Sequence, residues 1–323
     1  MRAGYNISSQ VTIYGATDED LTFGQQFGAT DIVINGNLIL GDGGRWQLLD
    51  LVKLRLRVEQ FGMSLTALEN VPISFYDHIM LNGPRRDEQV ENMIATVRNI
   101  ARAGISIFGY HWMPSFVWRT LPVAIRGGAL ATAFDDSIAK KFPLTHEREY
   151  NEEEMWANLE YWIKIITPIA EEEGIRLGIH PCDPPVEKLG GIPQLLRSFD
   201  SYKRLIEIYP SASNGIEFCQ GTFSEMKDDI YEMIRYFGER KKILYVHFRN
   251  VSGKVPNFYE EFVNTGYVDM HKAMKIYHEV GFDGFFVDDH VPHTHGDTTW
   301  GHRGRAFANG YIQAMIEAVQ KEK

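Results

Sequence analysis

Short runs rich in β-branched and aromatic residues alternate along the chain with longer stretches whose apolar residues recur at helical spacing. Strands are predicted at Val11–Tyr14, Asp31–Ile34, Ser64–Leu68, Ile105–Tyr110, Arg176–His180, Gly215–Cys219, Ile243–His247 and Gly284–Asp289. Helices are predicted at Asp18–Phe27, Trp46–Phe61, Asp87–Ala103, Glu152–Glu173, Ile192–Tyr209, Ser224–Phe237, Val268–Val280 and Gly304–Val319. Pro168 lies inside the fourth helix and predicts a kink or a break there.

Strict alternation of strand and helix is typical of an α/β protein with a parallel sheet, and eight such units favour a closed (β/α)8 TIM barrel. The rival is a doubly wound open sheet, which usually carries a glycine-rich phosphate-binding turn after its first strand. The segment Gly15-Ala16-Thr17 is not such a turn. We therefore expect residues 1–323 to form a single barrel domain.

Two connections in this pattern are long for a compact barrel. They span about residues 112–150, after the fourth predicted strand, and residues 250–266, after the seventh. Long loops of a compact domain are usually lids or binding segments. Both loops follow strand ends, so we expect them on the face that carries the active site in such barrels.

The composition excludes several classes of partner. With 44% hydrophobic and 24% charged residues the chain is typical of a soluble globular protein. Its formal charge of −10 and its lack of a basic run argue against nucleic acid. It has no apolar run long enough for a membrane span, and Met1–Gly15 does not resemble a signal peptide. We expect a cytoplasmic protein with reduced thiols.

Four residues that suit a divalent metal follow the last four predicted strands: His180, Cys219, His247 and Asp289. Each residue taken alone has a structural explanation that needs no metal. A histidine before proline can be structural, and a free cysteine is usually a small buried apolar residue. A disulfide between Cys182 and Cys219 also stays open. A parallel barrel, however, gathers its strand ends at one mouth. Imidazole, thiolate and carboxylate together suit manganese, iron(II) or zinc, so the joint placement favours a metal site.

The segment from His290 to Arg305 adds further polar groups beside this site. Its polar residues are His293, His295, Asp297, Trp300, His302 and Arg303. So many polar and titratable residues beside a predicted metal site favour a role in acid–base chemistry or substrate binding over a simple solvent-exposed loop. Arg249, which closely follows His247, could meet a carboxylate through a two-point hydrogen-bonded pair, and Arg119 and Arg303 are further candidates.

Several specific motifs occur in order along nearly the whole chain. They are Glu69-Asn70-Val71-Pro72-Ile73, Tyr110-His111-Trp112-Met113-Pro114, Trp118-Arg119-Thr120, Phe134-Asp135, His180-Pro181-Cys182-Asp183-Pro184-Pro185, Phe218-Cys219-Gln220-Gly221, His247-Phe248-Arg249-Asn250-Val251 and Asp289-His290. With these motifs the chain resembles the mannonate dehydratase family, a metal-dependent branch of the xylose-isomerase-like barrels.

The resemblance implies a hydro-lyase of carbohydrate metabolism, in hexuronate catabolism, that converts D-mannonate to 2-keto-3-deoxy-D-gluconate and water. It implies one divalent ion, Mn2+ or Fe2+, held by His180, Cys219, His247 and Asp289, with His290 as an acid–base residue. The sequence departs from the family at Cys182, Asp288 and Val291. It also has Trp300 where the family has its catalytic tyrosine, and an indole cannot supply a titrating proton.

These observations lead to a set of expected roles. Asp289 and His290 belong to the catalytic centre, and His302 or Asp297 is expected to make the second proton transfer. The expected substrate-binding residues are Arg249, Arg119, Trp112, Asn250, Arg303 and Trp300. The expected partner is a small sugar acid, and a homo-oligomer is compatible with the sequence.

Two alternatives stay open. The same barrel and ion could serve a sugar isomerase or epimerase, which the change to Trp300 favours. A sugar-acid-binding homologue without catalysis is the other. A nuclease of related fold is disfavoured, because it would need a carboxylate-rich site for several metals and a basic surface.

Overall fold

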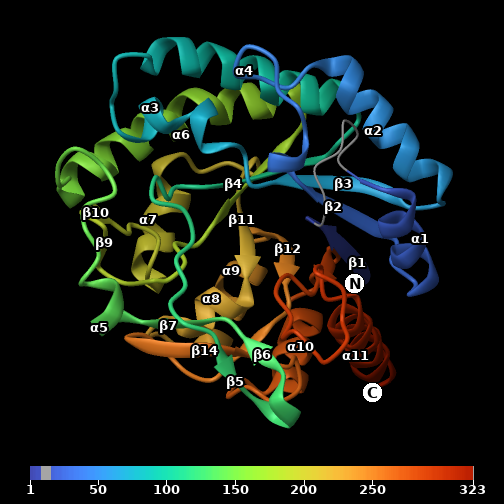
Figure 1. The fold of residues 1–323 in the computed structure, drawn as a ribbon. Helices are drawn as coiled ribbons and strands as arrows, with labels where there is room; N and C mark the ends of the chain where they lie inside the picture. Colours follow the sequence, from blue (N-terminus) through green and yellow to red (C-terminus); the bar gives the residue numbers. More distant parts are fainter. Residues whose placement is uncertain (9–15, 323) are drawn as a thin grey trace.

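The computed structural model describes residues 1–8 and 16–322, and within them eight parallel strands close into a barrel (Figure 1). Around the ring the strands are β1 (Arg2–Ile7), β15 (Phe285–Val287), β12 (Ile243–His247), β11 (Asn214–Cys219), β8 (Arg176–His180), β4 (Ile107–His111), β3 (Ser64–Glu69) and β2 (Asp31–Asn35). The last of these pairs with β1 and completes the ring. The predicted (β/α)8 barrel is therefore confirmed.

Helices surround the barrel on its outer side (Figure 1). They are α1 (Asp18–Gln26), α2 (Leu48–Gln60), α3 (Asp77–Met80), α4 (Arg86–Arg102), α5 (Asp136–Ala139), α6 (Glu152–Glu173), α7 (Phe199–Ile208), α8 (Gln220–Glu225), α9 (Ile230–Glu239), α10 (Met270–Glu279) and α11 (His302–Lys321). In α9 the buried residues Ile230, Met233, Ile234 and Phe237 recur every three or four positions, which is the stripe a helix needs to cover a sheet. Among residues 1–8 and 16–322, no helix is both long and apolar enough to cross a bilayer.

The barrel strands are buried on both faces, which explains their nearly continuous apolar runs. All five residues of β12 are buried, and so are all five of β4. Strands of parallel sheets read this way because helices cover one face and the barrel interior fills the other. The polar residues at the ends of these strands therefore stand out in the sequence.

Short antiparallel sheets lie outside the barrel and join the long loops. In the largest, β14 (Asn257–Glu261) pairs with β13 (Asn250–Val251) and with β7 (Ala133–Asp135). The others pair β5 (Val123–Ala124) with β6 (Leu130–Ala131), and β9 (Lys188–Leu189) with β10 (Ile192–Pro193). A single bridge also links Leu130 to His293 in the last loop. The two loops expected to be long thus form one layer over the barrel.

The first strand differs from the prediction. The predicted run Val11–Tyr14 lies outside the described residues, and the first barrel strand is β1, Arg2–Ile7. The sequence pattern does not predict this strand, because Gly4 and Asn6 interrupt its apolar residues. Asn6 is buried in the barrel, where it donates a hydrogen bond to Glu69, so a polar partner takes the place of an apolar one.

Two predicted helices have different bounds in the structure. The helix expected at Ile192–Tyr209 begins only at Phe199, where the side chain of Ser198 caps it, and the preceding residues form β10. The helix expected at Ser224–Phe237 divides into α8 and α9, and the side chain of Asp229 caps the second. In both cases a capping side chain inside the periodic stretch marks the true start.

Helix α6 contains Pro168 but is not divided by it. Proline removes one backbone hydrogen bond from a helix and usually weakens it. Here the flanking turns bury Trp162, Ile163, Ile166 and Ala170, so packing on both sides of the proline holds the helix together.

Two glycine substitutions test how tightly the barrel interior is filled. A methyl group at Gly109 in β4 would collide with Glu217 and with the hydroxyl of Tyr245, whereas one at Gly310 in α11 would meet nothing within 4 Å. We expect Gly109→Ala to lower the free energy of unfolding by about 1–3 kcal/mol. Gly310→Ala, in an exposed helix interior, should raise it by up to about 1 kcal/mol. Denaturant unfolding followed by circular dichroism measures both, and equal midpoints would contradict this description of the interior.

Candidate metal centre and adjoining cavity

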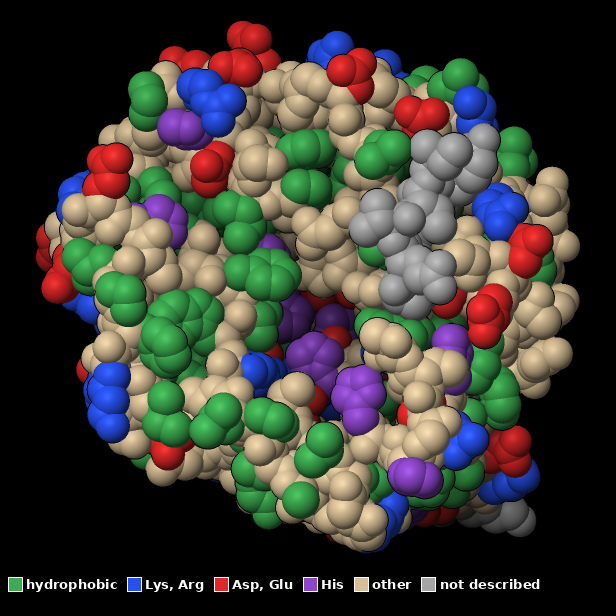
Figure 2. Space-filling model, viewed as in Figure 1, with side chains coloured by type: hydrophobic (Ala, Val, Ile, Leu, Met, Phe, Trp, Pro, Cys, Tyr) green, Lys and Arg blue, Asp and Glu red, His purple; other side chains and the backbone are tan. Residues whose placement is uncertain are grey.

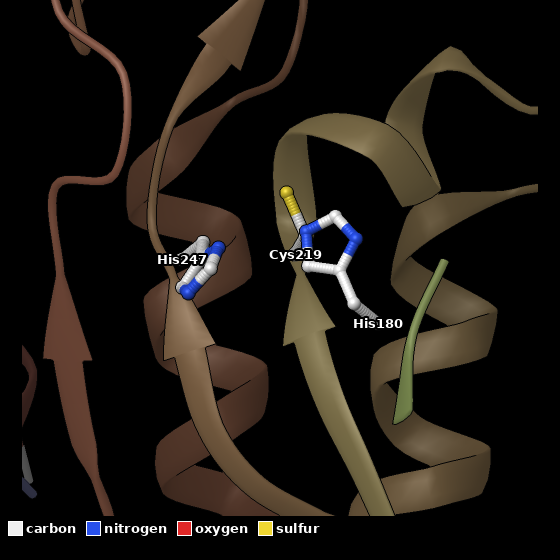
Figure 3. Close-up of side chains that lie close together, drawn as sticks. All are labelled: His180, Cys219 and His247. Atoms are coloured by element: carbon white, nitrogen blue, oxygen red, sulfur yellow. The ribbon is translucent and has the colours of Figure 1, made fainter. Parts of the chain in front are cut away.

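Three of the predicted ligands come together at the ends of neighbouring barrel strands. His180 ends β8, Cys219 ends β11 and His247 ends β12. Cys219 and His247 lie directly opposite each other in the register of their strands. One potential ligand atom from each residue lies within 4.8 Å of those of the other two, and Figure 3 shows the three side chains grouped together. Strand pairing thus assembles these side chains, as expected from the sequence.

The fourth predicted ligand, Asp289, approaches from the other side. Its Oδ2 atom lies 3.4 Å from Nδ1 of His247 and 3.7 Å from Sγ of Cys219. Asp289 is two residues beyond β15 and has a left-handed backbone, with φ of 58°. Such a conformation is uncommon outside glycine and often marks a functional position. The structure therefore brings all four predicted ligand residues to one place.

The two cysteines have opposite electrostatic surroundings, although both are buried and free. Burial alone would raise the pKa of Cys219, but the positive charges of Arg249 and His180 outweigh it and lower the pKa to about 5. Burial raises the pKa of Cys182 to about 12. Cys219 is thus a thiolate at neutral pH, the form that binds metals, and Cys182 is a neutral thiol. Both thiols are free in the structure, so the disulfide that the sequence left open is not formed.

Hydrogen bonds leave one nitrogen of each histidine free for a ligand. Nδ1 of His180 lies 2.7 Å from the carbonyl oxygen of Pro181 and can donate to it, so Nε2 is available. Nε2 of His247 lies 3.1 Å from a carboxylate oxygen of Glu69, whereas its buried Nδ1 has no hydrogen-bond partner among the described residues. Two imidazoles with a free nitrogen, a thiolate and a carboxylate fit a transition-metal ion.

A cavity of about 350 Å³ opens beside these residues. It is lined by Asn35, Asn70, Met113, Phe116, Val117, His180, Asp183, His247, Asp289 and His290. Figure 2 shows histidine side chains gathered in the hollow at the centre of this face. Asn70 and Phe116, like Asp289, have a positive φ. Strained backbone of this kind concentrates at binding sites, and the volume suits a small polar molecule.

His290 is the residue best placed for proton transfer in this cavity. Its Nδ1 lies 2.6 Å from Oε1 of Glu260, while its side chain remains 41% exposed. Burial opposes protonation of His290, but the carboxylates of Asp289 and Glu260 outweigh this effect and raise its pKa. A carboxylate that holds one imidazole nitrogen fixes the ring and turns the other nitrogen toward the cavity.

Arg249, expected to bind a substrate carboxylate, is instead held inside the protein. Its side chain is 2% exposed. It donates hydrogen bonds to Asp289 at 2.9 Å, Glu225 at 3.1 Å, Asp183 at 3.0 Å and the hydroxyl of Thr222 at 2.9 Å. These contacts use four of its five N–H donors and the side chain is almost fully buried, so Arg249 cannot make a two-point contact with a ligand. The structure thus places Arg249 beneath the site as an internal counter-ion.

The other expected substrate-binding residues also have internal partners. Arg119 forms a two-point pair with Asp183 at 2.7 and 2.8 Å and contacts Glu260 at 2.9 Å. Trp112 is fully buried in the core, and the side-chain amide of Asn250 is bonded to backbone groups of its own loop. None of the three is among the residues that line the cavity.

Arg303 and Trp300 support the last loop and helix α11. Arg303 donates to the carbonyl oxygen of His295 at 2.9 Å. The guanidinium of Arg305 lies 3.5 Å from the ring centre of Trp300 and donates to its carbonyl oxygen. Trp300 therefore packs against a buried arginine, in keeping with its inability to replace a catalytic tyrosine chemically.

The two residues expected to make the second proton transfer lie elsewhere. Asp297 accepts hydrogen bonds from the backbone N–H groups of Arg303 and Gly304, in the first turn of α11, and from Thr298 and Thr294. His302 lies at the start of the same helix against α1, with Nδ1 2.6 Å from the hydroxyl of Thr298. Neither lines the cavity, so this expectation is not supported by the structure.

The residues that sequence reasoning missed are mostly buried acids. Glu69 and Glu217 lie below His247, and Glu260 holds His290. Glu69 ends the apolar strand β3, a signal comparable to that of His247 and Cys219. Glu260 alternates with exposed residues in β14 and carried no such signal.

The role of Asp297 can be tested through stability. We expect Asp297→Ala to lower the free energy of unfolding by about 0.5–2 kcal/mol, because two N–H groups at the start of α11 lose their acceptor. Metal stoichiometry should stay unchanged, because Asp297 is remote from the ligands. Thermal unfolding and elemental analysis measure these two properties. Loss of metal with unchanged stability would contradict the assignment.

The role of Cys219 can be tested through metal binding. We expect Cys219→Ser to weaken Mn2+ binding by more than the roughly 10–100-fold typical of residues that only orient a ligand. The reason is that a hydroxyl does not ionise at neutral pH. Cys182→Ser is the matched control, since the same change in a neutral, buried thiol should preserve affinity. Equal affinities of the two variants would argue against coordination by Cys219.

Comparison with known proteins agrees with this geometry. The family model described as D-mannonate dehydratase (UxuA) matches residues 9–146 and 136–323. The mannonate dehydratase of Streptococcus uberis is 32% identical in an alignment that covers 86% of this chain and 88% of that protein. The crystal structure of mannonate dehydratase from Streptococcus suis serotype 2 aligns with a TM-score of 0.87 and 29% identity, over 99% of this chain and 94% of the other.

A more distant likeness concerns the fold alone. A xylose isomerase domain protein from Planctomyces limnophilus aligns with a TM-score of 0.65 at 10% identity, over 99% of this chain and 98% of the other. This is the barrel class that the motifs indicated. Together with the matches that extend along almost the whole sequence, it leads to one conclusion: this chain belongs to the D-mannonate dehydratase family, a family of hydro-lyases built on a xylose-isomerase-like barrel.

Proposed function

We propose that this protein removes water from D-mannonate to give 2-keto-3-deoxy-D-gluconate. One divalent ion, Mn2+ or Fe2+, is held by His180, Cys219, His247 and Asp289. The observation that carries the proposal is the meeting of these four side chains beside a polar cavity, in a chain of this family.

The reaction breaks two bonds on adjacent carbons of the sugar acid. The hydrogen beside the carboxylate leaves as a proton, and its electron pair forms a carbon–carbon double bond. The neighbouring hydroxyl takes up a proton and departs as water, and the resulting enol becomes the ketone. The proton beside a carboxylate is very weakly acidic, so charge that builds on the carboxylate must be stabilised. A bound divalent ion supplies this stabilisation as a Lewis acid.

His290 carries one of the two proton transfers. It lines the cavity, it is partly exposed, and Glu260 holds its Nδ1, so Nε2 is the atom that exchanges the proton. The amides of Asn35 and Asn70 line the same cavity and can bind sugar hydroxyls in either direction, because an amide both donates and accepts. Arg249 and Arg119 keep the surrounding acids in place and do not reach the substrate.

A sugar-acid isomerase or epimerase is the second candidate. Trp300 favours it, because dehydration needs a second acid–base group and the family's tyrosine is absent at that position. Mass spectrometry of the product separates the two functions, since dehydration lowers the product mass by one water and epimerisation conserves it. A homologue that only binds sugar acids would show neither change, and no exchange of carbon-bound hydrogen for deuterium.

The function can be tested with one variant and a panel of six-carbon sugar acids. With Mn2+ present we expect the wild-type protein to form the 2-keto-3-deoxy product from mannonate. His290→Asn should lower the rate by at least the 10²–10⁴-fold typical of a lost acid–base group, while metal stays bound. His278→Asn, on the exposed face of α10, is the matched control. Normal turnover by His290→Asn would refute its assigned role, and conversion without loss of water would refute the dehydration.

A further inference from the structure

A pair of carboxylates lies inside the barrel directly below the metal centre. Glu69 ends β3 and Glu217 lies in β11, and both side chains are at most 2% exposed. Each has an oxygen near the same atom of His247: Nε2 is 3.1 Å from Glu69 Oε2 and 3.3 Å from Glu217 Oε1. Carboxylates almost never lie this deep unless they are paired or hydrogen-bonded, so their position calls for an explanation.

The two acids are not equivalent. Glu69 accepts hydrogen bonds from the side-chain amide of Asn6 and, at 3.2 Å, from the hydroxyl of Tyr245. Neither carboxylate oxygen of Glu217 has a hydrogen-bond partner within the part of the chain that the structure describes. Glu69 is thus fixed by two other strands of the barrel, β1 and β12. It is the carboxylate that can hold an imidazole in one orientation.

The opposite side of the same imidazole faces the metal centre. Nδ1 of His247 is buried, has no hydrogen-bond partner among the described residues, and lies 3.4 Å from Oδ2 of Asp289. A neutral imidazole carries one proton, on one nitrogen or on the other. A proton placed on Nε2 and directed at Glu69 leaves the lone pair of Nδ1 pointing at Cys219 and Asp289.

We propose that Glu69 is a positioning residue for the metal centre: it holds His247 as the tautomer protonated on Nε2, so that Nδ1 serves as the metal ligand. This inference rests on the metal centre of the proposed function and goes beyond it, since it assigns a role to a residue that touches neither metal nor substrate. Carboxylates behind metal-binding histidines fix the ring and strengthen the ligand. Asn6 and Tyr245 act through Glu69 by holding its carboxylate.

The experiment measures metal affinity instead of turnover. Metal is removed from the purified protein with a chelator, and Mn2+ is then titrated by calorimetry, with stoichiometry from elemental analysis. Glu69→Gln keeps the size of the side chain but removes the charge and turns one oxygen into a donor. We expect it to weaken Mn2+ binding about 10–100-fold, as for other residues that orient a metal ligand.

Two further variants make the result specific. Glu217→Gln is the matched control, at a similar depth and a similar distance from His247, and should weaken binding by less than about tenfold. Tyr245→Phe removes one hydrogen bond to Glu69 without removing the ring, and should weaken binding in the same direction by a smaller factor than Glu69→Gln. The thermal stability of each metal-free variant shows whether it is folded, and Tyr245→Phe carries the test if Glu69→Gln does not fold.

The measured Mn2+ affinities and stoichiometries distinguish the proposal from its alternatives. Wild-type affinity in Glu69→Gln, or in Tyr245→Phe if that is the folded variant, would overturn the proposal. Equal losses in Glu69→Gln and Glu217→Gln would overturn it as well, because the effect would then not be specific to the acid that Asn6 and Tyr245 hold in place. Two bound ions in the wild type and one in Glu69→Gln would make Glu69 a ligand. A wild-type protein that binds no metal would instead refute the proposed function itself.

Discussion

Four acidic side chains and the sulfur of Cys219 surround the guanidinium of Arg249 deep in the mouth of the barrel, and the arrangement of the whole site depends on this contact. The side chains of Asp289, Glu225 and Asp183 accept its hydrogen bonds, and Glu260 lies 3.6 Å away. The positive charge of Arg249 also lowers the pKa of Cys219. Buried acids would otherwise repel one another, and a buried thiol would keep its proton. Arg249, together with Arg119, therefore lets the thiolate of Cys219 and the neighbouring acids coexist.

The two long loops above the barrel contribute further groups to this cluster of charged residues, and the loops are paired with each other. The strand β14 brings Glu260 to His290, and Arg119 from the other long loop binds Glu260 and Asp183. The antiparallel sheet of β7, β13 and β14 fixes these loops relative to each other. Groups from four separate parts of the sequence thus come within hydrogen-bonding distance of one another, because the loops pair with one another and not only with the barrel.

A similar contact appears twice in the site: a buried acid lies against one nitrogen of a histidine, and the other nitrogen faces the cavity or the proposed metal centre. Glu260 does this for His290 and Glu69 for His247. His247 ends a barrel strand and His290 follows one by three residues, and in both pairs the acid comes from a distant strand. The chemistry of each imidazole therefore depends on contacts across 30 and 178 positions of the sequence.

The local sequence pattern was enough to predict that the proposed ligand residues lie close together. Each of His180, Cys219 and His247 ends an apolar strand, and parallel strands in a closed barrel place such residues at one mouth. The same reasoning did not find β1, where Asn6 faces a polar partner inside the barrel. It also gave substrate-binding roles to Arg249 and Arg119, since a sequence does not reveal which acids will occupy a guanidinium.

The sequence itself determined the alternation of strands and helices, the closed barrel and the convergence of the four proposed ligand residues, because these follow from side-chain periodicity within each segment. The tertiary structure alone decided which histidine nitrogen faces the centre, which arginines are internal counter-ions, and that Asp297 and His302 serve helix α11 and its contact with α1. Those outcomes depend on partners brought together only when the barrel closes. Pairing between distant side chains in a water-poor interior leaves no mark on local periodicity.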